Sequence, residues 1–431
     1  MQSPRLRRTF ETLVRTFPPE EVTRRNADAE VDPREAGLDA RDVDAIWRAA
    51  VGVYASGLYP AVQLCLRRRG KVVIDRAIGH TLGNAPSDPP DAHKTQATPA
   101  TLFNLFSASK AVTAILVHLA DQQHQIHLDD PVAHYLPEFG RHGKHRITLR
   151  HVLTHRAGIP QIPPEFADVA LLEHPEQILQ ILCDARPQLY PGRRLAYHAL
   201  TGGFVLGAVL ERVTGKSMRA LLRDQILAPL GFDAFNYGVP AARMPEVARN
   251  AFTGPPVVPP LAGLIRRALS VDFHDAVRMS NDPRFLQATV PAGNVIGTAN
   301  EASRFMQLLL DGGQLDGVRV LDARTVRRAV AEDSYLEVDL TLGLPIRYSM
   351  GFMLGARVGS LYGLGTSRAF GHLGFTNVIV YADPQRDIAV AIMTSGKPAL
   401  SPGLVRTLWL PQVIARRCPR DWGQGRVDRG R

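Results

Sequence analysis

Cysteine, lysine and long apolar runs are all scarce in this chain of 431 residues. Its three cysteines, Cys65, Cys183 and Cys418, lie far apart without C-x-x-C spacing, which excludes a disulfide framework and a thiolate metal site. The longest apolar stretches, such as residues 114–117 and 388–393, are far shorter than the roughly 18 to 20 residues that a membrane-spanning helix needs. The arginine-rich N-terminal stretch contains acidic residues and no apolar core, so no secretory signal or transit peptide is expected. We therefore predict a cytoplasmic protein without a transmembrane segment.

The positive charge of the chain comes from arginine. Only six of the 51 basic residues are lysines, and the formal net charge is +10. Such a charge permits contact with nucleic acid or an anionic membrane by long-range attraction. The arginines are spread along the whole chain, however, and no basic block alternates with aromatic residues or matches a DNA- or RNA-binding motif. We predict a solvated basic surface and no nucleic-acid partner.

Strand signals occur near both ends of the chain. Residues 61–66 and 71–77 are apolar runs separated by a glycine-containing turn, which predicts a hairpin. Residues 350–354, 377–381 and 388–394 are further strand candidates, and the last two are joined by a turn over residues 383–387. Strands at both ends predict an α/β (α+β) domain built from the two termini.

Helical periodicity dominates the middle of the chain. It occurs in residues 108–119, 149–154, 175–183, 203–213, 218–227 and 299–310. The proline-rich segment 253–292 is too long for a plain connection, so we expect it to be mobile or to shape a substrate pocket. The predicted organisation is an N-terminal extension (1–44), a sheet domain (45–105 and 293–415), an inserted helical domain (106–292) and a disordered tail (416–431).

A serine and a lysine form an S-x-x-K pair at the start of the predicted helix 108–119. Ser107 and Lys110 are one helical turn apart, so both face the same side. A serine is a poor nucleophile until a base takes its proton, and a lysine serves as that base only if desolvation and the helix N-terminus lower its pKa. With 15 serines and six lysines, about 0.2 such pairs arise by chance, so the motif alone is modest evidence.

Two other motifs do not fit their structural context. Residues 365–369 approximate a G-x-S-x-G nucleophile elbow, but a glycine-rich stretch leads into a strand there instead of a strand into a helix. Residues 215–217 resemble the end of a phosphate-binding loop, yet Leu210 stands where that loop needs a glycine. We therefore predict no nucleophile at Ser367 and no ATP site.

Further motifs occur in a fixed order around the S-x-x-K pair. They are residues 98–103, 128–139, 149–158, 191–215, 292–299 and 370–375. With these motifs the sequence resembles the superfamily of serine β-lactamases and penicillin-recognising hydrolases, especially class C β-lactamases and family VIII carboxylesterases, over roughly residues 45–400. The resemblance implies an antiparallel sheet flanked by helices, an inserted helical domain, and an active site between them.

The resemblance also implies roles for individual residues. Ser107 would be the acyl nucleophile, Lys110 its base partner, and Tyr197 the phenol that relays a proton to the leaving group. The motif His372-Leu373-Gly374 would line the site on a strand, and the backbone N–H groups of Ser107 and Phe375 would form the oxyanion hole. We expect the phenolate form of Tyr197 to be stabilised by a nearby ammonium group. His151 and His155 are interpreted as structural residues away from the nucleophile.

One position departs from the β-lactamase pattern. The second motif of β-lactamases is Tyr-x-Asn, whereas Ala199 stands at its third position here, and a methyl group cannot bond a substrate amide. Many family VIII esterases also lack this asparagine. We predict a serine hydrolase that cleaves small carboxylic esters without metal or cofactor. A β-lactamase, a D-amino-acid peptidase, an acyltransferase and a non-catalytic scaffold remain alternatives, and the oligomeric state is open, a homodimer being one alternative.

Overall fold

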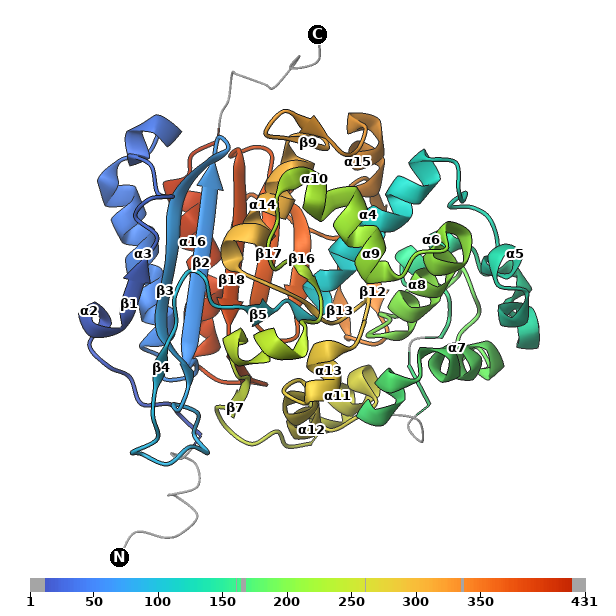
Figure 1. Ribbon diagram of the computed structural model, residues 1–431, viewed down its shortest axis with the longest axis horizontal. Helices are drawn as coiled ribbons and strands as arrows, with labels where there is room; N and C mark the ends of the chain where they lie inside the picture. The colour runs from blue at the N-terminus through green and yellow to red at the C-terminus, as the bar shows by residue number, and fades with distance from the viewer. Residues whose placement is uncertain (1–11, 160, 164–167, 260, 335–336, 421–431) are drawn as a thin grey trace, which may run out of the picture.

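The computed structural model describes residues 12–159, 161–163, 168–259, 261–334 and 337–420. It is built around one large antiparallel sheet with helices on both faces and a mostly helical region beside it (Figure 1). The strand order is β1-β3-β2-β18-β17-β16-β15-β14-β11, and β4 also pairs with β3. Strands from the two ends of the chain therefore meet where β2 pairs with β18.

The strands of this sheet are β1 Thr23–Arg25, β2 Ala61–Arg68, β3 Lys71–Leu82, β4 Thr95–Gln96, β11 Glu332–Ser334, β14 Tyr348–Ser349, β15 Met353–Leu354, β16 Phe370–Gly374, β17 Val378–Asp383 and β18 Ile388–Thr394. Smaller sheets contain β5 Phe103–Asn104, β6 Asn236–Tyr237 and β8 Val295–Gly297; β7 Ala251–Thr253 and β19 Gly396–Pro398; β9 Gln314–Leu315 and β10 Val318–Arg319; and β12 Val338–Asp339 and β13 Leu344–Pro345.

The α-helices are α2 Pro19–Val22, α3 Ala40–Tyr54, α4 Ser109–Gln122, α5 Val132–Tyr135, α6 Leu149–Leu153, α7 Pro175–Asp184, α8 Thr201–Thr214, α9 Met218–Leu222, α10 Ala228–Leu230, α11 Leu261–Leu269, α12 Phe273–Met279, α13 Pro283–Gln287, α14 Ala299–Leu310, α15 Ala323–Ala329 and α16 Leu404–Arg417. Short 3₁₀ turns are η1 Pro33–Ala36, η2 Phe106–Ala108, η5 Val169–Glu173 and η7 Ala241–Glu246. The segment η3 Pro137–Arg146 consists of two 3₁₀ pieces separated by a kink at residues 141–143, and η6 Arg223–Leu227 is a π-helical turn. No described helix is long and apolar enough to cross a bilayer.

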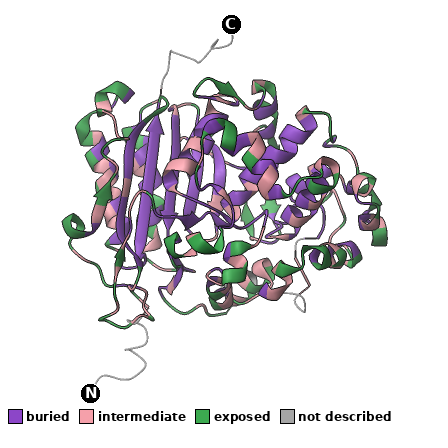
Figure 2. Cartoon of the chain, in the orientation of Figure 1, coloured by how far each residue is buried: buried purple, intermediate pink, exposed green. Residues whose placement is uncertain are grey.

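Helices cover both faces of the sheet. On one face α3 and α16 pack against each other, and α3 also packs against β2 and β3. On the other face α14 packs against β2, β17 and β18. Every residue of β18 is buried as a result, which explains why residues 388–394 read as a continuous apolar run. Figure 2 shows the strands of the sheet mostly in the colour of buried residues and the outer helices in a mixture of the three colours.

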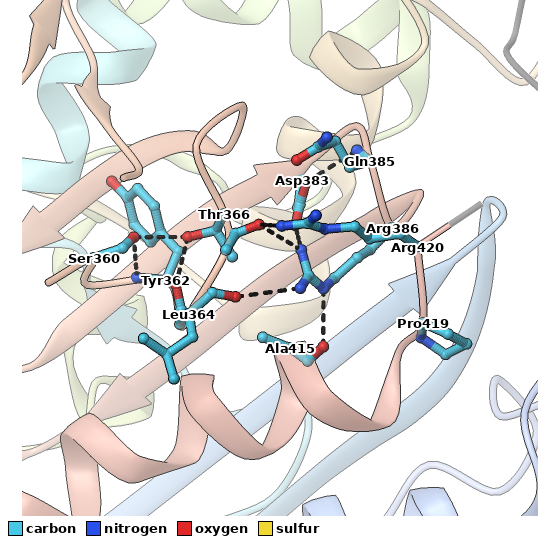
Figure 3. A network of polar contacts seen from close by, with 12 residues as sticks. Ser360, Tyr362, Leu364, Thr366, Asp383, Gln385, Arg386, Ala415, Pro419 and Arg420 are labelled. Carbon is cyan, nitrogen blue, oxygen red and sulfur yellow. Dashed lines mark hydrogen bonds and ion pairs between the residues drawn. The ribbon is translucent and has the colours of Figure 1, made fainter. Parts of the chain in front are cut away.

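A buried polar network attaches α16 to the sheet (Figure 3). The Arg386 guanidinium donates to the Asp383 carboxylate at 2.7 Å and to the backbone oxygen of Ala415 in α16 at 2.9 Å. Further donors of Arg386 bond the backbone oxygens of Leu364 and Gly365. The loop that contains the rejected G-x-S-x-G-like motif is thus a structural connection, and Ser367 is exposed on it.

The expected hairpin, the strands β17 and β18, and the helices α4, α6, α7, α8 and α14 are confirmed to within a few residues. The expected strand 350–354 is wrong in part, because residues 350–352 form the turn between β14 and β15. The division into sheet and helical domains stays a prediction.

Both predicted terminal segments need correction where they are described. Part of the segment 1–44 belongs to the sheet layer, since β1 pairs with β3 and α3 begins at Ala40. In the predicted disordered tail, α16 continues to Arg417 and Cys418 is fully buried, while residues 1–11 and 421–431 lie outside the described part. The start of α3 was not predicted because charged residues alternate with the apolar residues of its buried face. The helix α16 was not predicted because it contains Pro411.

Candidate active site

The nucleophile candidate lies on a tight turn between β5 and α4. Ser107 is in the middle of η2, and Phe106 before it has a positive φ of 49°. The turn is held from both sides, because the N–H of Phe106 donates to the Asn104 side chain at 2.8 Å and the N–H of Val295 donates to the Ser109 hydroxyl at 2.9 Å. Ser109 is therefore a buried structural acceptor, whereas Ser107 is partly exposed and lines a cavity.

Lys110 lies one turn along α4 and points back to Ser107. Its Nζ donates to the Ser107 Oγ at 3.2 Å, to the backbone oxygen of Ala199 at 2.7 Å, and to the backbone oxygen of Ala292 at 3.2 Å. None of these three acceptors is an anion. Burial therefore lowers the pKa of Lys110 to about 7, because nothing compensates the desolvation of its charged form.

Tyr197 lies on the other side of the nucleophile. The Lys110 Nζ is 4.8 Å from the centre of its ring, and the phenol shares a hydrogen bond with the Ser107 hydroxyl. Burial raises the pKa of Tyr197, while the bond to Ser107 acts in the opposite direction. Burial thus favours a neutral phenol at Tyr197 and a neutral amine at Lys110. It does not favour the expected pair of a phenolate and an ammonium group.

A buried carboxylate that the sequence did not reveal fixes the backbone of Tyr197. The Asp339 Oδ1 accepts from the N–H groups of Tyr197, Thr341 and Leu342 at 3.1, 2.8 and 3.0 Å, and its Oδ2 accepts from the Tyr348 hydroxyl at 3.1 Å. The Asp339 side chain is fully buried. Asp339 is 142 residues from Tyr197 in the sequence and belongs to no local motif, so no sequence signal pointed to it.

His155 also contacts the site, contrary to our expectation. Its ring centre is 4.7 Å from that of Tyr197, and its Nδ1 accepts from the N–H of His198 at 3.2 Å. Burial and neighbouring basic groups hold the pKa of His155 well below its usual value, so the ring is a neutral support for Tyr197. His151, in contrast, forms the capping box of α6 with Thr148 and is structural.

The strand β16 brings the third motif to the nucleophile. A side chain at Gly374 would place its Cβ 2.1 Å from the backbone oxygen of Leu105, so only glycine allows the strand to approach the turn this closely. Phe375 follows with a positive φ of 51°, and its ring stacks on Phe106 at 5.2 Å. This arrangement places the backbone of Phe375 beside the turn that carries Ser107.

His372 lies on β16 as a neutral imidazole. It is buried, and its Nδ1 donates to the backbone oxygen of Leu373 at 2.7 Å. Burial, with Lys110 nearby, lowers the pKa of His372 to about 3. The ring is therefore uncharged at neutral pH.

A cavity of about 390 Å³ opens at Ser107. Tyr197, Ala199, Phe375 and residues of α7, α8, α11, α12 and α13 also line it. Most of these side chains are apolar, and none of the described residues that line it is lysine, arginine or histidine. The cavity thus presents the Ser107 hydroxyl, five phenylalanine rings and other apolar side chains of the helices, with Lys110 adjacent to that hydroxyl.

This geometry is suited to acyl transfer. A neutral Lys110 within 3.2 Å can accept the Ser107 proton, and a neutral phenol can donate one to a leaving group. The structure brings together the residues Ser107, Lys110, Tyr197, Ala199, His372, Gly374 and Phe375, and their roles stay predictions.

The β-lactamase family model matches residues 31–410. The chain belongs to the β-lactamase family. Within this family, the Esterase/beta-lactamase LipL of Mycobacterium tuberculosis is 29% identical over 311 residues, which cover 67% of this chain and 68% of LipL.

Two solved structures of family members share the fold. A penicillin-binding protein homologue from Caulobacter crescentus has a TM-score of 0.74 and 26% identity, with 88% of this chain and 99% of that chain covered. A family VIII carboxylesterase has a TM-score of 0.73 and 26% identity, with 89% and 99% covered. The protein therefore has the β-lactamase/transpeptidase-like fold. It is an enzyme of this serine hydrolase superfamily.

Proposed function

We propose that this β-lactamase family protein is a carboxylester hydrolase that acts through an acyl-enzyme on Ser107. Lys110 takes the proton of the Ser107 hydroxyl, and Tyr197 donates a proton to the leaving alcohol. The N–H groups of Ser107 and Phe375 bind the oxygen of the tetrahedral intermediate. Water then attacks the ester bond of the acyl-enzyme, which releases the acid and restores the serine.

The observation that carries this proposal is the lack of a fixed cation in the described lining of the cavity. Penicillins, cephalosporins and D-alanyl peptides all carry a free carboxylate, which a protein recognises with arginine or lysine. Here His372 is neutral, and Lys110 has a pKa of about 7 and is bonded to backbone oxygens. An uncharged ester needs no such partner, and Ala199 offers no amide to a β-lactam side chain.

The names of the relatives support the proposal that the protein is a hydrolase, but they differ in the substrate. LipL is named both an esterase and a β-lactamase, and one structural neighbour is a carboxylesterase while another is a penicillin-binding protein homologue. A β-lactamase, a D-amino-acid peptidase and an acyltransferase that uses an alcohol instead of water share the same first step. The apolar cavity, whose described lining contains no cation, favours the ester over the first two.

A comparison of substrates tests the proposal. The purified protein is assayed with p-nitrophenyl acetate, p-nitrophenyl butyrate, a chromogenic cephalosporin and D-alanine p-nitroanilide. We expect kcat/KM for the esters to exceed that for the cephalosporin by about a hundredfold or more, because an alkoxide or phenolate leaves more easily than an amine. Higher turnover of the cephalosporin or the anilide would refute the esterase, and no reaction with a fluorophosphonate would favour a scaffold.

Location and assembly also remain proposals. Cys65, Cys183 and Cys418 are free, buried thiols, which suits the reducing cytoplasm. Cell fractionation tests the location, and light scattering of the purified protein tests whether it is a homodimer.

A further inference from the structure

The size and lining of the cavity at Ser107 carry an inference about the substrate that rests on the proposed function. The sequence led us to expect small esters. A cavity of about 390 Å³ lies within the range of roughly 300 to 1,000 Å³ that encloses whole drug-sized ligands. An acetyl or butyryl group would leave most of this volume unfilled.

Three helices each turn an apolar face to the cavity. Ile178, Ile181 and Leu182 of α7 have i, i+3, i+4 spacing, and so do Ile265, Ala268 and Leu269 of α11. On α12, Phe273 and Ala276 line the cavity at i, i+3. Ile178, Leu182 and Phe273 are buried, so these faces pack partly against other side chains and also form the lining of the cavity.

The apolar lining of the cavity extends from these helices to the turn that carries Ser107. Phe273 of α12 stacks on Phe375 at 5.0 Å, and Phe375 stacks on Phe106 at 5.2 Å. A hydrocarbon chain attached at Ser107 can therefore extend along aromatic rings onto the helical faces without leaving apolar surroundings. The few polar groups of the lining include Asp168, whose carboxylate is already bonded to the N–H of Ala170.

We propose that this cavity is a binding site for a long hydrocarbon chain, and that the enzyme prefers esters in which one chain has about eight or more carbons. Burial of each methylene is worth roughly 0.8 kcal/mol, or up to about a fourfold gain in kcat/KM where the fit is good. The segment 253–292, which supplies α11 to α13, then sets the chain length that the enzyme accepts.

The experiment uses two ester series below their micelle concentrations. In the first series the acyl chain of a p-nitrophenyl ester grows from acetate to butyrate, octanoate and laurate. In the second series the alcohol of an acetate ester grows from ethyl to hexyl and decyl. We expect kcat/KM to rise by about a hundredfold or more between two and eight carbons in one series. The series that rises tells whether the cavity holds the acyl or the alcohol chain.

Variants connect the preference to the cavity. Ala268→Trp and Ala276→Trp should lower kcat/KM for the eight-carbon ester by about tenfold or more and leave the two-carbon ester within about twofold, because they fill cavity volume at the helices α11 and α12 and not at the turn that carries Ser107. Gly263→Trp on the same helix α11 is the matched control, since Gly263 is exposed and no described atom lies within 4 Å of its Cβ position, and it should change neither rate. Retained turnover of the two-carbon ester shows that a variant is folded. If both tryptophan variants lose turnover of the two-carbon ester, the smaller substitution Ala276→Leu is assayed in their place.

Failure of the chain-binding site can be distinguished from failure of the proposed esterase function. If both series are flat or fall with chain length while fluorophosphonate still labels the protein and acetate esters still turn over, the chain site is refuted and the esterase stands. Equal losses in Ala268→Trp and Gly263→Trp would also refute the chain site. If no ester turns over and no label binds, the proposed function itself fails.

Discussion

At the scale of single residues, the chemistry depends on the protonation of Lys110. Its amine bonds three neutral oxygens, so burial alone holds its pKa at about 7. An amine accepts the Ser107 proton only in its neutral form, which is populated above that pKa. We therefore predict that kcat/KM for an activated ester rises with pH through about 7 and then levels off.

Lys110→Arg tests this role against a purely electrostatic one. A guanidinium stays protonated at all working pH values, so the variant should lose activity as fully as Lys110→Ala. Retention of more than about a tenth of the wild-type kcat, a loss below roughly 1.4 kcal/mol, would mean that another group is the base. Initial rates of p-nitrophenyl butyrate hydrolysis between pH 5.5 and 9 measure both the profile and the loss.

Ala199 offers a second test at this scale. Its methyl group lines the cavity, and its backbone oxygen already bonds Lys110. Ala199→Asn would supply an amide to the acylamino group of a β-lactam, and a hydrogen bond of this kind is worth roughly 1 to 3 kcal/mol, about 5-fold to 150-fold. We predict a relative gain in cephalosporin hydrolysis over ester hydrolysis, measured as the ratio of the two kcat/KM values. An unchanged ratio would show that this position does not set the preference.

At the scale of elements, the site depends on the attachment of the Tyr197 segment to β12, where Asp339 lies. Removal of this carboxylate leaves three buried N–H groups and a tyrosine hydroxyl without their acceptor. Asp339→Ala should therefore lower the free energy of unfolding by roughly 3 kcal/mol or more, at about 1 to 3 kcal/mol for each orphaned group. Because Tyr197 loses its anchor, kcat of the folded variant should also fall by about tenfold or more.

Asp383 provides the matched control for this prediction. It is equally buried, but its partner Arg386 belongs to the network that attaches α16 (Figure 3). Asp383→Ala breaks a buried ion pair, which costs roughly 3 to 5 kcal/mol of stability, and should leave kcat of the folded fraction within about twofold. Urea unfolding and active-site titration of both variants separate the two effects. Equal kcat in the two variants would show that Asp339 has no role in positioning.

The elements also show what the sequence could and could not reveal. The strand β18 and the helix α14 were predicted at their observed bounds, since a run of buried residues and a regular apolar spacing are local signals. The turn inside 350–354, the continuation of α16 past Pro411 and the contact of His155 with Tyr197 depend on distant partners. Ordered motifs identified Ser107, Lys110 and Tyr197, whereas no local pattern reveals which carboxylate holds a backbone segment.

At the scale of the whole molecule, buried neutral bases govern how stability depends on pH. Burial lowers the pKa of Lys110 and of Lys397 to about 7, and Lys397 lies beneath Phe106 with its Nζ bonded to the backbone oxygen of Thr394. Between pH 7 and about 10 the unfolded chain binds protons at these lysines that the folded chain does not. Stability therefore rises with pH in this window, and the cost of the buried charges is fully present below about pH 7.

Urea unfolding at pH 7 and 9 checks this prediction. The free energy of unfolding should be larger at pH 9, and Lys397→Met should reduce that difference because it removes one of the two shifted groups. Lys71→Met, which replaces an exposed lysine paired with Glu35, should leave the difference unchanged. A lower free energy of unfolding at pH 9 than at pH 7 would contradict this prediction. So would a Lys397→Met variant in which the difference between the two pH values is as large as in the wild type.

Mapping of a covalent adduct shows directly whether Ser107 carries the acyl group. The protein is treated with a fluorophosphonate, digested, and mapped by mass spectrometry, with Ser107→Ala and the exposed-site variant Ser367→Ala in parallel. We expect a single adduct on Ser107, which is retained in Ser367→Ala. In Ser107→Ala we expect the label to be lost and ester turnover to fall by a factor of about 10⁴ or more. An adduct on Ser109 or Ser367, or ester turnover that survives in Ser107→Ala, would contradict this expectation.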